Sequence, residues 1–227
     1  MSGKGRGLGI ASVVVGLVGV MLALGSFMYA RSSYEAFVIS STNMEPTYTP
    51  GDRIVSEPID GSEVRRGDVV ALSAPERYQG STSVIQRVIG VGGDRVVCCT
   101  GEGPEARLSV NGKPVPEPYV NGGDADGLRK SYDVTVPERR LFLLGDHRAD
   151  SIDSRFFPSD HDGTVAESAV RGRVIDGQTI PVVIGTAVIA GLVLALVGLG
   201  LGIAAFVLGR RRRRAVPVAP RPVEQVQ

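Results

Sequence analysis

The amino-acid sequence predicts a mainly β protein, with an antiparallel β domain over residues 31–179 flanked by two transmembrane helices. Two charge-free apolar stretches predict the helices, at residues 8–30 and 180–209. Between them, short runs rich in Val, Ile and Leu alternate with Gly, Pro, Asn and Asp, which is typical of strands joined by tight turns. Residues 1–7 and a basic tail, 210–227, complete the chain.

The first apolar stretch, Leu8–Ala30, is rich in Val, Leu, Gly and Ala. As a helix it would reach about 34 Å at roughly 1.5 Å per residue, enough to cross the core of a bilayer. A cleaved signal peptide is the alternative, but the run is longer than the usual apolar region of such a peptide, so an uncleaved anchor is favoured. A buried core helix is a further alternative, but so long a run without one charge is rare in a soluble domain.

The second apolar stretch is longer and would cross a bilayer with some tilt. Pro181 suits its first turn, where the missing N–H leaves no hydrogen bond unmade. An apolar helix followed by the arginines 210–214 also resembles a cell-wall sorting signal, but no LPxTG-like motif precedes it. The sequence therefore predicts a second membrane anchor.

Charge is distributed unevenly along a chain whose formal net charge is only +1. Lys4 and Arg6 are the only charges before residue 31, residues 31–180 carry seventeen basic and twenty-three acidic side chains (−6), and the remainder carries +5. Because positive flanks stay in the cytoplasm, we expect both termini there, with the central domain outside the plasma membrane and in contact with membrane lipid. The near-neutral balance argues against a nucleic-acid binder, which needs a basic face.

The central region contains eight runs that predict strands, and SVNGKPV places an Asn-Gly between short apolar runs, a strong hairpin signal. The predicted strands are 53–56, 68–72, 83–91, 95–99, 107–110, 130–136, 140–144 and 171–175. The only two cysteines, Cys98 and Cys99, exclude a disulfide framework and leave free thiols or a bridge between neighbours open.

Three segments carry the sequence's functional information. FVISSTNMEPTY (37–48) with its trailing GD resembles the Ser-x-Ser-Met-x-Pro-Thr box of the type I signal peptidase family. VIQRVIGVGGD (84–94) is similar to that family's Ile-Lys-Arg-x-x-Gly-x-x-Gly-Asp segment, and GDHRADSIDSR (145–155) to its Gly-Asp-Asn-x-x-x-Ser-x-Asp-Ser-Arg box. VRGRV (170–174) fits downstream. The boxes follow in the family's order over residues 37–174, and the anchors agree.

The resemblance implies a membrane serine endopeptidase of the protein-export pathway, in which a serine is activated by a neutral lysine. Asn43 stands at the serine position and Gln86 at the lysine position, so both catalytic groups are replaced. Ser41 matches the hydroxyl that stabilises the oxyanion, and Ser151 is the fourth candidate catalytic position, beside Ser41, Asn43 and Gln86. Lys4, Lys113 and Lys130, the only lysines, do not match the base. We expect the two amides to hydrogen-bond to each other.

The resemblance also implies which residues bind the substrate and which support the site. The expected substrate-binding positions are Phe37, Ile39, Ser40, Val84 and Ile85, and the supporting positions are Met44, Pro46, Arg87, Asp146, Asp153 and Arg155. Asp146, His147, Asp150 and Asp153 have metal-ligand chemistry, but the box match favours a polar network. We expect neither metal nor cofactor.

Three functions follow from these observations. The first is a family member that binds signal peptides of exported pre-proteins, alone or beside an active paralogue, without cleaving them. The second is a working signal peptidase with an atypical nucleophile. The third is a membrane scaffold that retains only the fold. Strand addition needs no catalytic residue, which favours the first.

Overall fold

The computed structural model describes residues 3–78, 83–101, 105–175 and 179–214 of the chain. The chain divides into two compact units, one formed by the two terminal segments and one by Ser33–Asp176. The first unit holds the helices α1 (Gly3–Ser33) and α2 (Thr179–Arg214), which extend the predicted helices at both ends. Within them, Gly9–Ser33 and Val182–Arg210 are long and apolar enough to cross a membrane.

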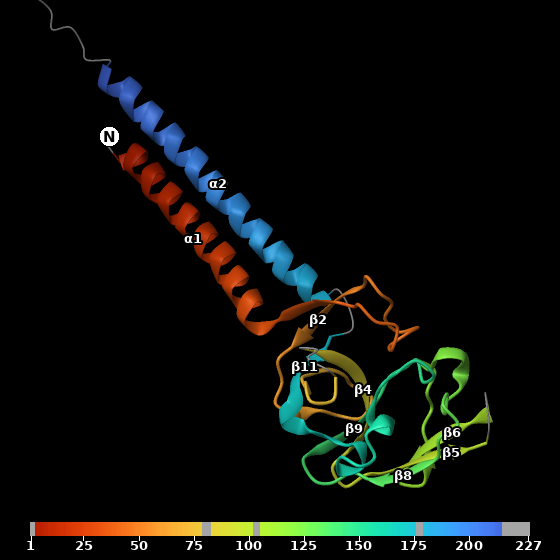
Figure 1. Ribbon diagram of the computed structural model, residues 1–227. Helices are drawn as coiled ribbons and strands as arrows, with labels where there is room; N and C mark the ends of the chain where they lie inside the picture. The colour runs from red at the N-terminus through yellow and green to blue at the C-terminus, as the bar shows by residue number, and fades with distance from the viewer. Residues whose placement is uncertain (1–2, 79–82, 102–104, 176–178, 215–227) are drawn as a thin grey trace, which may run out of the picture. The chain divides into compact units, whose positions relative to one another are not determined.

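Small residues bring α1 and α2 into close contact (Figure 1). A Cβ on Gly19 would lie 2.4 Å from the amide nitrogen of Ala195, and one on Gly198 would lie 2.4 Å from that of Gly16. The two backbones therefore approach as closely as glycine allows, which is how helices associate where no hydrophobic effect drives them together.

We predict that Gly19→Leu separates the two helices. In a background with Ser12→Cys and Gly202→Cys, the two Cβ positions are 3.9 Å apart and suit a disulfide. Oxidation in isolated membranes should then form the cross-link, and Gly19→Leu should abolish most of it. Protection of both thiols from a maleimide reagent measures the cross-link, with Cys98 and Cys99 replaced by serine.

Gly25→Leu is the matched control, because a Cβ on Gly25 meets nothing within 4 Å. It should leave the cross-link unchanged. Equal cross-linking in the Gly19→Leu and Gly25→Leu chains would contradict the close contact of the helices.

The second unit contains a seven-stranded antiparallel sheet, in the order β1-β2-β11-β3-β4-β9-β10. Its strands are β1 (Glu35–Val38), β2 (Arg53–Glu57), β3 (Val69–Leu72), β4 (Val84–Val91), β9 (Arg140–Leu144), β10 (Val165–Ala166) and β11 (Val170–Val174). β1 lies at one end of the sheet, so one of its edges has no partner among the described strands. The mainly antiparallel β architecture predicted from sequence is confirmed.

A smaller sheet follows the order β7-β6-β5-β8. It comprises β5 (Arg95–Thr100), β6 (Arg107–Val110), β7 (Lys113–Pro114) and β8 (Tyr132–Thr135). Asn111 and Gly112 both have positive φ, 53° and 74°, as a type I′ turn requires, so the predicted hairpin is confirmed. Cys98 and Cys99 form a disulfide with each other, the second of the two alternatives left open by the sequence.

Short 3-10 helices occupy the connections of the β domain: η1 (Gly61–Glu63), η3 (Asn121–Gly123), η4 (Ser154–Phe156), η5 (His161–Gly163) and η6 (Glu167–Ala169). The eight predicted strands correspond to observed ones within two residues at each end. β1, β7 and β10, with four, two and two residues, were not among them. β7 and β10 are too short for an alternating pattern to stand out from their turns, and β1, with the sequence EAFV, does not alternate between polar and apolar residues.

Apolar clusters hold the β domain together. One cluster joins the two sheets, with Phe142 and Leu144 of β9 against Val96 of β5 and Leu108 of β6. Another lies beneath β1 and β2 and contains Ile39, Met44, Ile54, Val69 and Val174. Phe37 and Ile85 pack against its margin, so this cluster fixes the segments that carry the first two boxes.

Candidate functional site

A cavity of about 450 Å³ lies where the three boxes meet in the β domain. Its wall comes from β1 and the turn after it, the beginning of β4 with the loop before it, and the segment around Asp150. The lining residues are Phe37, Val38, Ile39, Ser40, Ser41, Asn43, Arg77, Tyr78, Ser83, Val84, Ile85, Asp150 and Ile152. All five positions expected to bind substrate lie in this wall.

The open edge of β1 faces away from β2. Ile39 donates its N–H to Asp52 (2.9 Å) and accepts from the N–H of Gly51 (2.8 Å), so its peptide groups point toward β2. Because successive residues of a strand alternate in this direction, the N–H and C=O of Val38 point outward. Val38 lines the cavity and is 64% exposed.

The first residues of β4 present a second open edge. Val88 exchanges hydrogen bonds with Asp68 and Gly67, toward β3, so by alternation the peptide groups of Ile85 point to the opposite side. On that side β9 pairs with β4 only from Arg87 onward, where it lies opposite Leu144. The carbonyl of Ile85 is therefore beyond the end of β9, in the cavity wall.

Asn43 bridges two sides of the cavity through its amide. Its Nδ2 donates to the carbonyl oxygen of Ile85 at 2.8 Å, and its Oδ1 accepts from Ser41 Oγ at 2.6 Å. Its backbone carbonyl accepts from the N–H of His147 at 3.0 Å, which ties the first box to the third. Both ends of the amide therefore have partners.

Gln86 is completely buried, and its amide is held by loop residues. Nε2 donates to the carbonyl of Ile152 at 2.8 Å, and Oε1 accepts from the hydroxyl of Tyr78 at 3.3 Å. Burial is the main cause that raises the pKa of Tyr78 to about 12, so its hydroxyl remains a donor at neutral pH. The prediction of a hydrogen bond between Asn43 and Gln86 was wrong, because each amide has other partners: a backbone carbonyl accepts from its nitrogen and a hydroxyl donates to its oxygen.

The hydroxyls of the site differ in their surroundings. Ser40 and Ser41 are exposed in the wall of the cavity, and the hydroxyl of Ser41 is already engaged with Asn43. Ser151 is 2% exposed, and its Oγ has no hydrogen-bond partner among the residues that the structure describes. A Cβ on Gly145 would lie 2.3 Å from Ser151 Oγ and 2.5 Å from the carbonyl of Asn43, so glycine at 145 lets the two boxes approach.

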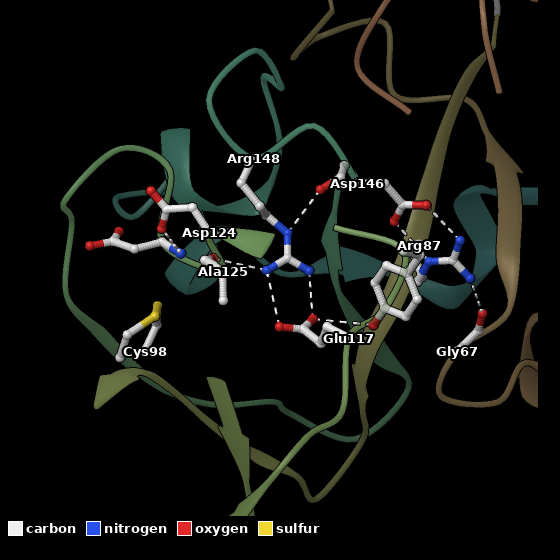
Figure 2. A network of polar contacts seen from close by, with 12 residues as sticks. Gly67, Arg87, Cys98, Glu117, Asp124, Ala125, Asp146 and Arg148 are labelled. Atoms are coloured by element: carbon white, nitrogen blue, oxygen red, sulfur yellow. Dashed lines mark hydrogen bonds and ion pairs between the residues drawn. A yellow bond between two sulfur atoms is a disulfide. The ribbon is translucent and has the colours of Figure 1, made fainter. Parts of the chain in front are cut away.

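Behind the cavity, Arg87 and Asp146 form a buried ion pair (Figure 2). The guanidinium donates to both carboxylate oxygens, at 2.8 and 2.6 Å, and to the carbonyl of Gly67. Asp146 also accepts from Thr47 Oγ1, and the ring of Tyr119 lies 3.9 Å from the Arg87 guanidinium. Burial works against the charge of Arg87, but the Asp146 carboxylate outweighs it and raises the pKa.

Arg148 is the centre of a second buried set of contacts in Figure 2. It donates to Glu117 (2.5 Å), to the carbonyl of Gly145 (2.9 Å) and to that of Ala125 (2.9 Å). Burial of this side chain, which is 1% exposed, opposes its charge, and the carboxylate of Glu117 overrides burial and raises the pKa of Arg148. The third box is thus fastened to the loop before β8.

A third ion pair, Asp153 with Arg155, joins two residues of the third box to each other. Arg155 donates to both Asp153 oxygens at 2.8 Å, and Asp153 also accepts from the N–H of Gly145 at 3.1 Å. The four expected supporting residues of the second and third boxes therefore lie in ion pairs: Arg87, Asp146, Asp153 and Arg155.

The remaining supporting positions differ from one another. Met44 is 1% exposed and belongs to the apolar cluster beneath β1, so it is a core residue. Pro46 is exposed beside it. Over the described ranges, no three His, Cys, Asp or Glu side chains are grouped as metal ligands.

Tyr78 and Ile152 are site residues that sequence reasoning missed. Both lie in loops, and both hold the buried amide of Gln86. Neither belongs to an alternating pattern. Ile152 lies inside the third box. Its 58% exposure beside the cavity would have identified it as a site residue, but that exposure is known only from the structure.

Comparison with known proteins places these boxes in a family. Residues 10–176 match the profile of the family described as signal peptidase, peptidase S26. Signal peptidase I of Bacillus licheniformis is 32% identical over 148 residues, 61% of this chain and 74% of that protein. Signal peptidase I T of Bacillus subtilis (strain 168) is 31% identical over 168 residues, 69% of this chain and 78% of that protein.

Among solved structures, the crystal structure of a signal peptidase I from Enterococcus faecalis V583 matches with 26% identity. The match covers 50% of this chain and 97% of that one, with a TM-score of 0.38. Because the family profile spans most of the chain, from the first apolar helix to the end of the β domain, the chain belongs to the signal peptidase (peptidase S26) family.

Proposed function

We propose that this protein binds signal peptides of exported pre-proteins in the cavity of the β domain and does not cleave them. The family supplies the substrate class. In this proposal, two helices anchor the protein in the plasma membrane and both termini lie in the cytoplasm. The β domain lies outside the membrane, where it contacts pre-proteins during export.

The observation that carries the binding role is the pair of open strand edges in the cavity wall. Outward peptide groups of Val38 and Ile85 both border the same space. An extended peptide can add to such edges through its own backbone, and pockets for alternate side chains then give specificity. Phe37, Ile39, Val84 and Ile85 make part of the wall apolar, as a short apolar peptide segment requires, while Arg77 and Asp150 add charge to it.

Loss of cleavage follows from the chemistry at positions 43 and 86. The nitrogen lone pair of an amide is delocalised, so neither Asn43 nor Gln86 can act as nucleophile or general base. Among the residues that line the cavity there is no lysine. Lys130, one of three lysines in the chain, lies 5.5 Å from the ring of Phe156 instead.

A second candidate, an active signal peptidase with an atypical nucleophile, is favoured by one observation. The hydroxyls of Ser40, Ser41 and Ser83 lie in the cavity wall. Serine attack needs a base within hydrogen-bond reach, and Ser41 donates to an amide oxygen instead. The structure therefore favours binding over catalysis.

Binding of a fluorescent signal peptide to the full-length protein in detergent tests the proposal. Wild type should bind the peptide, prefer it over a scrambled peptide of the same composition, and leave a pre-protein intact. Val38→Pro removes one outward N–H without touching the β1–β2 ladder, and should weaken binding roughly three- to ten-fold, the value of about one hydrogen bond.

Val38→Ala is the matched control, because it shortens the side chain and keeps the N–H. It should bind more tightly than Val38→Pro. Absence of binding by wild type would refute a peptide-binding role and favour a membrane scaffold. Cleavage that disappears on replacing a cavity serine would establish the active alternative.

A further inference from the structure

The hydrogen bond from Asn43 to Ile85 occupies a group that a bound peptide would use. Strand addition at the start of β4 requires the peptide to donate an N–H to an outward carbonyl of β4. The outward carbonyl in the cavity wall is that of Ile85, and Asn43 Nδ2 already donates to it at 2.8 Å.

The amide of Asn43 is held in this position from several sides. Ser41 Oγ donates to the side-chain oxygen Oδ1 of Asn43, and the N–H of His147 donates to the backbone carbonyl of Asn43. The next residue, Met44, is fixed in the apolar cluster beneath β1 with 1% exposure. An anchored amide loses little conformational freedom on making its hydrogen bond, so it competes effectively with an incoming peptide.

We propose that the side chain of Asn43 is a built-in substitute for one peptide N–H, which caps Ile85 and lowers the affinity of the cavity for extended peptides. This inference rests on the proposed function. A carbonyl oxygen has two lone pairs, so the cap requires that the two donors exclude each other: a peptide N–H at this register either displaces the amide of Asn43 or stays away from Ile85. In both cases the number of hydrogen bonds to Ile85 is unchanged.

The cap has a consequence for peptide choice. A peptide without an N–H at the register of Ile85, such as one with proline there, loses nothing relative to a peptide with an N–H. The capped cavity therefore accepts proline at that single position, while the open edge of β1 continues to require an N–H elsewhere along the peptide.

An ester scan tests the cap directly. Each N–H of a fluorescent signal peptide is replaced in turn by an ester oxygen, and the affinity of each analogue is compared with that of the parent. In wild type, the analogue at the register of Ile85 should bind as well as the parent. In Asn43→Ala the same analogue should bind roughly two- to ten-fold more weakly than the parent.

The parent peptide should also bind Asn43→Ala roughly two- to ten-fold more tightly than wild type, because it gains a hydrogen bond that wild type does not offer. Asn43→Asp is the size-matched control: it fills the same space and cannot donate to Ile85. Its ratio of ester to parent affinity should follow Asn43→Ala, which separates the lost donor from the added room.

Three results would overturn the cap. In the first, wild type shows the same ester sensitivity as Asn43→Ala at every position. In the second, the two Asn43 variants show no sensitive position that wild type lacks. In the third, Asn43→Ala binds the parent peptide no more tightly than wild type does. If no peptide binds any of the proteins, the proposed function itself fails and the cap with it. Binding by wild type with any of the three results leaves the proposed function standing without the cap.

Discussion

Combining Asn43→Ser with Gln86→Lys is expected to give a chain that cleaves signal peptides, while each single change leaves it inert. Loss of members of a serine-type catalytic group typically reduces the rate by about three to six orders of magnitude, and such losses are far from additive. Restoring one member should therefore recover almost none of the rate, and restoring both should recover most of it.

The surroundings of position 86 favour a neutral lysine. Gln86 is completely buried, and burial depresses the pKa of a lysine because the charged form loses its hydration. The carbonyl of Ile152 and the hydroxyl of Tyr78 already surround the side-chain end. Ser151, whose buried hydroxyl has no partner in the described part of the chain, precedes Ile152 and belongs to the same box.

The sign of the pH dependence follows. A lysine acts as a base only when it is neutral, so cleavage by the double variant should rise as pH increases through its depressed pKa. The stability of the same variant should also rise with pH in the window between the folded and unfolded pKa values, because the unfolded chain binds the extra proton there. Wild type has no group at position 86 that titrates.

A gel assay of pre-protein processing, with purified protein in detergent, measures the restored activity. Asn43→Ser with Gln86→Met is the matched control, since methionine fills similar space without a basic nitrogen. If the double variant folds, binds signal peptide and still does not cleave, the site has lost more than two residues. If it folds and binds no peptide, the scaffold alternative gains.

Asp153→Ala is expected to destabilise the β domain strongly. Asp153 is fully buried, and its removal leaves the guanidinium of Arg155 buried without its carboxylate and the N–H of Gly145 without its acceptor. Breaking a buried ion pair on one side costs about 3–5 kcal/mol. The melting temperature of the β domain should fall by roughly 10 °C in a unit of this size.

Asp133→Ala is the control, because Asp133 also forms a two-point ion pair with an arginine, Arg95, but on the surface. The two side chains are 50% and 62% exposed, and exposed pairs of this kind contribute little to stability. Near-ultraviolet circular dichroism of the full-length protein measures both melts. Equal melting temperatures for the two variants would show that burial does not set the value of the pair.

Much of the architecture could be predicted because its signals are local. Apolar runs of more than twenty residues predict membrane helices, and an Asn-Gly between apolar runs predicts a hairpin whose two turn residues do have positive φ. The three boxes predicted which segments converge, and Phe37, Asn43, Val84 and Ile85 do line one cavity.

The partners of the two replaced residues could not be predicted, because they are backbone carbonyls. The sequence identifies side chains, and it does not show that Ile85 turns its carbonyl toward Asn43 or that Ile152 turns its own toward Gln86. Whether such a carbonyl points into the site depends on which neighbouring strand has ended and which continues. The burial of Met44 could not be predicted for a related reason, because it comes from residues of β2, β3 and β11 that are distant in sequence.

Gln86 and Arg87 are neighbours in β4 whose side chains lie on opposite faces of the sheet: Gln86 contacts Tyr78 and Ile152, two residues of the cavity wall, and Arg87 contacts Asp146. Their mutational histories can therefore be independent: a change at 86 alters the chemistry of the cavity and leaves the ion pair behind it intact. An enzyme built this way can lose its reaction and remain a well-folded receptor for the same peptide.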